Sequence, residues 1–434
     1  MNKQMSVVWI FMFVIFMVGP TISAAIFENV LDSTNYENRT IASMPEINKD
    51  DYETFPAEFE KYYNDNLPFR NELIDLNSKI SYYLFKDSAS EKVFLGQDEW
   101  LFYVEGVQTT TGQVKVWDVE LERIAENLNN AKQYFDYEGI EFVVFIAPNK
   151  SSIYQELLPE DYPIVSEKTR GQILADYLTE NTDVKVIFPI DEMTEIKKDY
   201  ETYLQFDTHW NNLGAYVGAK LINEQLGITM PELQELEIEA VSEARGDLAM
   251  MLHMSFENMG TDYLIGGYDN KLRDELDVME YHNETGDERN VVVKKDSFGL
   301  RLGQYFTPEY KNAYFVSDNP EKYIREYDAD VFVYEVVERN STSIWLDLNF
   351  IETEIECENE EKNIKFKAAT SRPLNYVTII KQSNNGEEME MIQVLESMDE
   401  MEVVVPAEET GEFYIYIFDD SEGQNVVKEM IVQY

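Results

Sequence analysis

The sequence predicts an α/β protein with a mostly parallel sheet that is covered by helices on both faces, followed by a small all-β sandwich. Two observations support this fold class. Between residues 91 and 340, short apolar runs alternate with segments of helical periodicity, which is the pattern of layered strands and helices. After residue 341, several segments alternate apolar and polar residues with period two, as half-exposed strands do.

The elements of the α/β region follow in order along the chain. A helix is predicted over residues 121–135, where apolar residues recur every three to four positions, and it ends near Gly139. Residues 142–147 form a continuous apolar run, which is typical of a strand buried on both faces. The same patterns predict further strands at residues 184–190, 291–293, 313–316 and 331–336, and further helices at 173–177 and 213–226.

Four regions divide the chain. Residues 1–27 form a signal-anchor or signal peptide, 28–90 a tether with a helical part at 55–86, 91–340 the α/β domain, and 341–434 the β-sandwich domain. Ligands of such α/β sheets bind beyond the carboxyl ends of the strands, so we expect functional residues directly after strands.

The N-terminus has the features of an export signal. Residues 7–27 carry no charge, they follow Lys3, and acidic residues come after them. These 21 uncharged residues can span a ~30 Å hydrocarbon core, and the small residues at 23–25 resemble a signal-peptidase site. We favour an uncleaved anchor over a cleaved signal. The predicted location is therefore the cell membrane, single-pass with the bulk extracellular, or secretion if cleavage occurs.

Composition excludes several classes of partner and cofactor. The formal net charge is −49, from 35 Lys and Arg against 84 Asp and Glu, which argues against nucleic acid and against anionic lipid head groups. Cys357 is the single cysteine and there are three histidines, so neither a disulfide framework nor a Cys- or His-rich metal centre is expected. We expect no cofactor and no metal.

Two segments carry residues suited to catalysis. Asp207 and His209 are two positions apart, so on an extended segment they face the same way and the carboxylate can accept the imidazole Nδ1–H. The predicted strand at 291–293 leads into Asp296 and Ser297, as in hydrolases that present a nucleophilic serine after a strand. Each segment also has an ordinary interpretation: Asp207 and His209 can ligate a metal or stabilise a loop, and Ser297 can cap a helix.

The segments together resemble the SGNH-hydrolase-like family of the alginate O-acetyltransferases, whose Gram-positive relatives are called DHHW proteins. The resemblance covers roughly residues 30–340 and implies an SGNH-like, flavodoxin-like sheet. It consists of short matching segments in a shared order: 37–39, 65–70, 94–103, 148–159, 207–215, 246–248, 296–298 and 330–339.

The resemblance implies that Ser297 is the nucleophile, His209 the general base and Asp207 the residue that orients it. Ser297 would take up an acetyl group and pass it to a polysaccharide hydroxyl, with a membrane-bound O-acyltransferase as the acetyl donor. Asp-x-His precedes Ser here, as in the acetyltransferase branch. Lys295 replaces the usual glycine, which places bulk or charge near the expected oxyanion site.

Other residues near these segments are predicted to contact substrate. Lys150 and Tyr154 follow the strand at 142–147 and are expected to line the cleft, while Trp210, like Trp100, is a candidate for stacking on sugar rings. Their ordinary interpretations are a surface lysine and packed aromatic side chains. Lys150 with residues 294 and 295 predicts a positive island on an acidic body, and the net charge favours a neutral glycan as acceptor.

Two alternatives stay open. A carbohydrate acetylesterase would use the same three residues, because water and a sugar hydroxyl compete for one acyl-enzyme. A non-catalytic polysaccharide-binding or assembly protein would bind glycan through the β-sandwich. A separation of more than roughly 5 Å between Ser297 Oγ and His209 Nε2 would favour the non-catalytic alternative.

Overall fold

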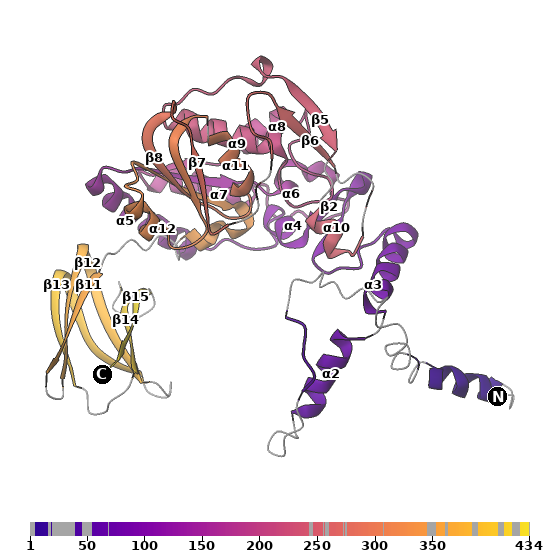
Figure 1. Ribbon diagram of the computed structural model, residues 1–434, viewed down its shortest axis with the longest axis horizontal. Helices are drawn as coiled ribbons and strands as arrows, with labels where there is room; N and C mark the ends of the chain where they lie inside the picture. The colour runs from indigo at the N-terminus through magenta and orange to yellow at the C-terminus, as the bar shows by residue number, and fades with distance from the viewer. Residues whose placement is uncertain are drawn as a thin grey trace.

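The computed structural model describes residues 5–15, 19, 40–45 and 54–344, except positions 68, 243–245, 255, 257–259, 272, 274–275 and 307, together with the backbone of five strands between residues 353 and 433. Within this part of the chain, a six-stranded sheet forms the centre of the α/β region (Figure 1). Five strands are parallel, and β7 joins the edge antiparallel to β9. Their order is β4 (Lys185–Ile187), β3 (Glu141–Ala147), β10 (Val331–Val337), β8 (Asp287–Lys294), β9 (Tyr310–Val316) and β7 (Val278–His282).

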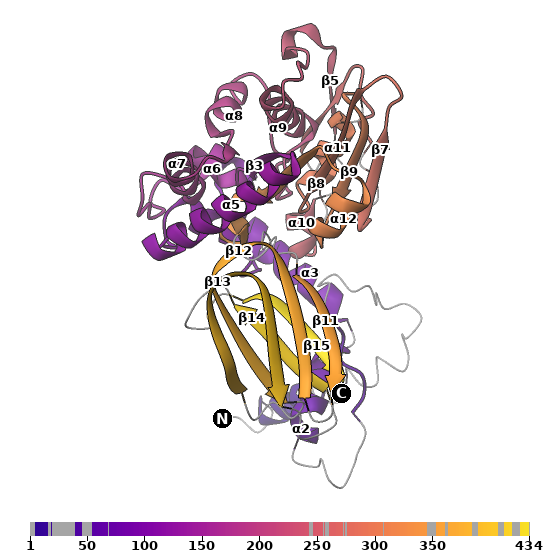
Figure 2. The same cartoon turned by 90° about the vertical axis from the view of Figure 1, so that its left-hand side faces the viewer.

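Helices cover both faces of this sheet, as predicted, and they do so because its central strands are apolar on both sides (Figure 2). Along β3, Val143 and Phe145 pack into one buried cluster, while Val144 and Ile146 pack into the other. The first cluster includes residues of α9 (Asn212–Gln225), α8 (Ile190–Ile196) and α11 (Gly299–Phe306). The second includes residues of α5 (Asp118–Glu138), α7 (Arg170–Asn181) and α12 (Pro320–Glu326).

Local signals explain where the main helices begin and end. Gly139 ends α5 in the left-handed conformation with φ of 76°, which a glycine adopts without steric cost. Thr169 begins α7 with a capping box, in which its side chain accepts from the backbone N–H of Gln172. Asn211 begins α9 by accepting a 3.0 Å hydrogen bond from the N–H of Gly214. The sequence therefore sets these boundaries within a few residues.

Smaller elements surround the sheet. The helical segment predicted at residues 55–86 consists of α2 (Phe55–Asp65), α3 (Arg70–Lys79) and η1 (Ile80–Phe85). Two antiparallel pairs of strands join β1 (Val93–Leu95) to β2 (Leu101–Tyr103) and β5 (Ile238–Ser242) to β6 (Thr261–Ile265). The short helices are α4 (Val104–Thr110), α6 (Lys150–Ile153), α10 (Asp247–Met251) and the 3-10 segments η2 (Gln97–Glu99), η3 (Gln155–Leu157), η4 (Leu233–Glu235) and η5 (Glu338–Ser343).

The C-terminal region is rich in β structure, as predicted. Its five strands form one antiparallel sheet, in which β12 pairs with β13 along one edge and with β11 and then β14 along the other. The strands are β11 (Thr353–Glu360), β12 (Asn363–Ser383), β13 (Met389–Pro406), β14 (Glu412–Phe418) and β15 (Val426–Gln433). The boundaries between the four predicted regions stay a prediction.

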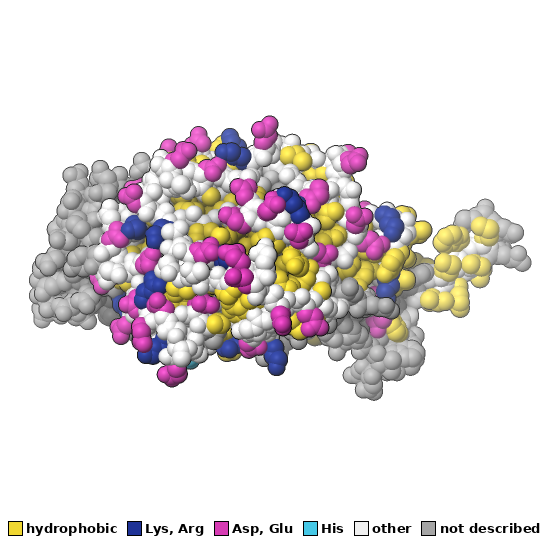
Figure 3. Space-filling view, turned by 90° about the horizontal axis from the view of Figure 1, so that it is seen from above, with side chains coloured by type: hydrophobic (Ala, Val, Ile, Leu, Met, Phe, Trp, Pro, Cys, Tyr) yellow, Lys and Arg dark blue, Asp and Glu magenta, His cyan; other side chains and the backbone are white. Residues whose placement is uncertain are grey.

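The N-terminal segment and the acidic surface complete the description. Residues 5–15 are helical, and their large apolar side chains are exposed (Figure 3). In the described part of the chain, no helix combines the length and the apolar character that crossing a membrane requires. Residues 16–18 and 20–27 of the predicted span at 7–27 lie outside the described residues. On the face seen in Figure 3, acidic side chains are spread over the α/β region rather than gathered in one patch.

Candidate active site

The candidate site lies at the carboxyl edge of the sheet. Ser297 follows β8, Lys150 follows β3 and Arg339 follows β10. Asp207 and His209 lie in a turn before α9, and this turn is closed by the bridge between Tyr203 and Trp210. The expectation that functional residues follow strands therefore holds for the serine, whereas the aspartate and histidine come from a separate turn.

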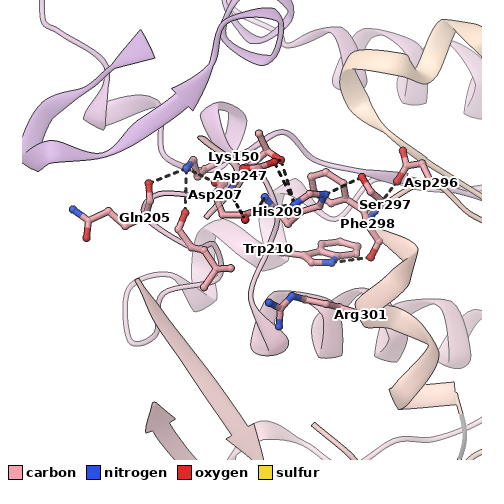
Figure 4. Close-up of polar contacts among 12 residues, drawn as sticks. Lys150, Gln205, Asp207, His209, Trp210, Asp247, Asp296, Ser297, Phe298 and Arg301 are labelled. Atoms are coloured by element: carbon pink, nitrogen blue, oxygen red, sulfur yellow. Dashed lines mark hydrogen bonds and ion pairs between the residues drawn. The ribbon is translucent and has the colours of Figure 1, made fainter. Parts of the chain in front are cut away.

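The structure brings Asp207, His209 and Ser297 into one line of hydrogen bonds (Figure 4). His209 Nε2 lies 2.8 Å from Ser297 Oγ, although the two residues are 88 positions apart in the chain. His209 Nδ1 lies 2.6 Å from Asp207 Oδ1. In this arrangement the carboxylate orients the imidazole and Nε2 can accept the serine proton.

Backbone hydrogen bonds hold the Asp207 carboxylate in place. Its Oδ1 also accepts from the His209 N–H at 2.9 Å, and its Oδ2 accepts from the Asp247 N–H at 2.9 Å. Burial alone would raise the pKa of Asp207, but the charge of His209 and these hydrogen bonds hold that pKa well below its ordinary value. Asp207 is therefore a carboxylate at neutral pH.

A second carboxylate, Asp247, lies beside this line at the start of α10. Its side chain accepts from Thr208 N–H at 2.7 Å and from Thr208 Oγ1 at 2.5 Å, and its Oδ2 is 3.7 Å from His209 Nδ1. Burial and the charge of Asp207 raise the pKa of Asp247. The sequence analysis did not predict that Asp247 lies beside Asp207 and His209. Gly246 is consistent with this close approach, because a Cβ there would lie 2.6 Å from the Phe206 carbonyl oxygen.

The turn that carries Ser297 is held from several sides. Asp296 accepts hydrogen bonds from the N–H groups of Phe298 at 2.8 Å and Val337 at 2.7 Å. The Asp296 N–H donates to Glu335 Oε2 at 2.9 Å, and burial, with the charge of Asp296, raises the pKa of Glu335 well above its ordinary value. Ser297 is therefore presented by a rigid strand-to-helix turn.

Lys295 does not reach the oxyanion region that the sequence suggested. Its side chain is buried and its Nζ lies 3.0 Å from Ser317 Oγ. The ammonium of Lys294 lies 4.8 Å from the ring centroid of Tyr334, which belongs to the buried cluster that α5, α7 and α12 share. The predicted positive island is therefore wrong, because alternate side chains of a strand point to opposite faces of the sheet.

The aromatic residues proposed to contact sugar are buried. Trp210 is fully buried and donates its Nε1–H to the Phe298 carbonyl at 3.1 Å, so it stabilises the turn that carries Ser297. Tyr154 is buried, accepts from the Thr202 N–H at 2.9 Å, and stacks on buried Trp100 at 4.6 Å between ring centroids. Burial and these contacts favour the packing interpretation for both residues, and their assignment as substrate contacts stays a prediction.

Lys150 lies at the site but is not available to a ligand. It is 4% exposed, and its ammonium donates three hydrogen bonds to backbone carbonyls. Burial lowers the pKa of Lys150 to about 7, although Asp207 and Asp247 act in the opposite direction. Where the sequence predicted a contact between Lys150 and substrate, the structure has Lys150 donating to backbone carbonyls.

Arg339 is the functional candidate that sequence reasoning left without a role. Its guanidinium lies 5.4 Å from the ring centroids of both Phe298 and Tyr103, and its charge opposes protonation of His209. It forms no ion pair with any residue of the described chain. Beside it lies a cavity of about 10 Å³, room for about one water, lined also by Lys150, Thr208 and other side chains.

One group of described residues has the atoms of a metal site. Ligand-type atoms of Asp207, His209 and Asp247 lie within 4.8 Å of one another. Both Asp207 oxygens and both Asp247 oxygens already accept hydrogen bonds, and His209 Nδ1 faces Asp207. The group is therefore accounted for as a hydrogen-bonded network, and we assign no metal to it.

Comparison with known proteins supports the predicted resemblance. Residues 93–264 match the family model described as the SGNH hydrolase-like domain of acetyltransferase AlgX. This match confirms the family resemblance and the SGNH-like α/β fold for that part of the chain. It contains Asp207 and His209 and ends before Ser297.

Two curated relatives are each named probable alginate O-acetylase AlgJ. The protein of Pseudomonas fluorescens is 26% identical over 210 residues, which is 46% of this chain and 51% of the relative. The protein of Pseudomonas aeruginosa is 24% identical over 185 residues, which is 42% of this chain and 44% of the relative. The chain thus spans about half the length of these relatives or less.

Solved structures give weaker likenesses. PatB1 of Bacillus cereus is 16% identical, with a TM-score of 0.45, over 59% of this chain and 97% of that chain. The O-acetyltransferase domain of Pseudomonas putida AlgJ is 18% identical, with a TM-score of 0.40, over 58% of this chain and 92% of that chain. Scores of this size are too low to support an argument about the site.

Proposed function

We propose that this chain is an O-acetyltransferase that moves an acetyl group onto hydroxyls of an extracellular or cell-wall polysaccharide through Ser297, His209 and Asp207. The observation that carries the proposal is the 2.8 Å contact between Ser297 Oγ and His209 Nε2, with Asp207 at Nδ1. This contact is well inside the roughly 5 Å limit beyond which a non-catalytic protein would be favoured.

The first half-reaction forms an acetyl-serine. Ser297 Oγ attacks the acetyl carbonyl carbon of the donor while His209 Nε2 takes the serine proton. The tetrahedral intermediate then breaks the bond between the carbonyl carbon and the donor oxygen, and that oxygen leaves with the proton returned by His209. The negative charge on Asp207 stabilises the imidazolium between these steps.

The second half-reaction transfers the acetyl group. A sugar hydroxyl gives its proton to His209 Nε2 and attacks the acetyl-serine carbonyl, and the Ser297 ester bond breaks as Oγ regains the proton. The carbonyl oxygen becomes negatively charged in both intermediates. The charge of Arg339 near Phe298 and the start of α11 are suited to stabilise it.

The cellular setting is part of the proposal. The uncharged segment at 7–27 supports a single-pass anchor that leaves the bulk of the chain outside the cell, or secretion if it is cleaved. A membrane-bound O-acyltransferase is the proposed acetyl donor, as the family resemblance implies. Water in place of the sugar hydroxyl would make the same site an acetylesterase, and this remains the second candidate.

The test is an assay of the purified extracellular part with an acetyl-ester reporter, with and without a glycan acceptor. Wild type is expected to release acetate from the reporter and to acetylate the glycan, whereas Ser297→Ala is expected to do neither above background. Acetate release without any glycan acetylation would assign the esterase. Equal activity of Ser297→Ala and wild type would contradict both enzymes.

We expect activity to fall in acid as His209 takes up a proton. Burial alone would lower the pKa of His209, but the charge of Asp207 and the hydrogen bond from Nδ1 outweigh it, so the pKa lies above the ordinary 6.5. The base is neutral only above this pKa, so kcat/KM should decline as pH falls through a value above 6.5.

The measurement is kcat/KM for the reporter ester against pH. Asp247→Asn provides the comparison, because it removes a negative charge 3.7 Å from His209 Nδ1. The midpoint of the acid limb is expected to move to lower pH in this variant. A wild-type midpoint below 6.5 would show that the base is not this histidine in this environment.

A further inference from the structure

Lys150 is a buried cation close to the reacting groups. It begins α6 directly after β3, and its ammonium lies 5.5 Å from the ring centroid of Trp100 and 5.2 Å from that of Phe102. Burying a lysine ammonium away from water costs free energy unless its N–H groups donate to other acceptors.

The acceptors are three carbonyl oxygens of one turn. Nζ donates to the carbonyls of Leu204 at 3.1 Å, Gln205 at 3.1 Å and Asp207 at 2.6 Å (Figure 4). An ammonium has three N–H donors, so all of them are used. The turn is closed by the Leu204 N–H, which donates to the His209 carbonyl at 3.2 Å.

The Asp207 main chain therefore meets Lys150 while its carboxylate meets the imidazole. Asp207 O accepts from Lys150, whereas Asp207 Oδ1 lies 2.6 Å from His209 Nδ1. Without the ammonium, the three carbonyl oxygens would face one another, and those of Leu204 and Asp207 would lose the donor that they share, while the Gln205 carbonyl would keep the Leu101 N–H at 3.2 Å. Their repulsion would open the turn and displace the carboxylate from the imidazole.

We propose that Lys150 is a positioning residue for the proposed acetyl transfer: it gathers the carbonyls of Leu204, Gln205 and Asp207 so that the Asp207 carboxylate meets His209 Nδ1. It does not contact substrate, because no N–H remains for one. The inference rests on the proposed function for its kinetic consequence, while its structural consequence can be measured without turnover.

The test compares Lys150→Met with a matched control, Lys197→Met. The Lys197 ammonium also donates to a backbone carbonyl, that of Ile153 in α6, but it does not contact the turn at 204–207. Lys150→Met is expected to lower kcat for the reporter ester by about 10²-fold, the loss typical of a catalytic group displaced by about 1 Å, with KM little changed. Lys197→Met is expected to keep kcat within about threefold, because the hydrogen bonds of Lys197 go to Ile153 and Glu156 and not to the turn.

A spectroscopic reading separates positioning from a general loss of structure. The proton between Asp207 Oδ1 and His209 Nδ1 should give a low-field proton NMR resonance in wild type, in Lys197→Met and in Ser297→Ala. Lys150→Met is expected to lose this resonance or shift it upfield. If Lys150→Met does not fold, Lys150→Gln, which retains two N–H donors, is expected to fold with lowered kcat and a shifted resonance.

Several outcomes would overturn the inference. They are a wild-type kcat in Lys150→Met, an unshifted resonance in a folded Lys150 variant, or a raised KM with unchanged kcat in Lys150→Met, which would restore the substrate-contact interpretation. A failure of the proposed function looks different: Ser297→Ala would remain as active as wild type, while the resonance would still respond to Lys150.

Discussion

Replacing Asp207 with asparagine is expected to lower kcat/KM for acetyl transfer by about 10⁴-fold without unfolding the protein, because the amide stabilises the wrong imidazole tautomer. Asp207 Oδ1 lies 2.6 Å from His209 Nδ1 and holds Nε2 toward Ser297. The asparagine amide group can donate to Nδ1, which would place the imidazole proton on Nε2, where it could no longer accept from the serine. The measurement is kcat/KM for the reporter ester above the acid limb, with circular dichroism to check the fold.

Asp247→Asn is the matched control for this substitution. Asp247 is a second partly buried carboxylate near the same imidazole, but it is 3.7 Å from Nδ1 and accepts its hydrogen bonds from Thr208. Its asparagine variant should lose far less activity than Asp207→Asn. If Asp247→Asn were the more damaging of the two, the assignment of the orienting carboxylate would have to be reversed.

Replacing Arg301 with methionine is expected to destabilise the α/β region by about 3–5 kcal/mol, the cost of leaving a buried charge without its partner. Arg301 and Asp262 are both buried, and Arg301 Nη1 lies 2.8 Å from Asp262 Oδ2 and 2.8 Å from Asn212 Oδ1. These contacts join α11, β6 and α9. The free energy of unfolding in denaturant measures the effect.

Two comparisons test the origin of this loss. The double variant Arg301→Met with Asp262→Leu removes both charges, so it should be more stable than Arg301→Met alone. Lys311→Met breaks an exposed pair with Glu288 and should leave unfolding unchanged within error. If the double variant were the less stable one, loss of packing rather than an uncompensated carboxylate would be the cause.

Several parts of the fold were predictable because their signals are local. The apolar run at 142–147 predicts a strand that is buried on both faces, and β3 is such a strand. The spacing of apolar residues between Leu121 and Phe135, with Gly139 after them, predicts α5 and its end. The pairing of Asp207 with His209 is also local, because the two residues are two positions apart.

The rest of the site depends on residues brought together from distant parts of the chain. Asp247 meets Asp207 through its backbone N–H from 40 positions away, which no side-chain pattern reveals. Lys150 and Lys197 are both lysines beside helices in the sequence, yet the first is 4% exposed at the centre of the site. Nothing local to either residue distinguishes them, because burial depends on what packs against a side chain.

The sequence by itself determined the central strands, the helices α5, α7 and α9, the Asp-x-His pair and the serine after a strand, since these depend on neighbouring residues. Only the tertiary structure decided that His209 reaches Ser297, that Trp210 and Tyr154 are packed rather than open to a ligand, and that Lys150 faces a turn instead of solvent. The physical reason is that hydrogen-bond partners and loss of water are set by chain segments that meet only after folding.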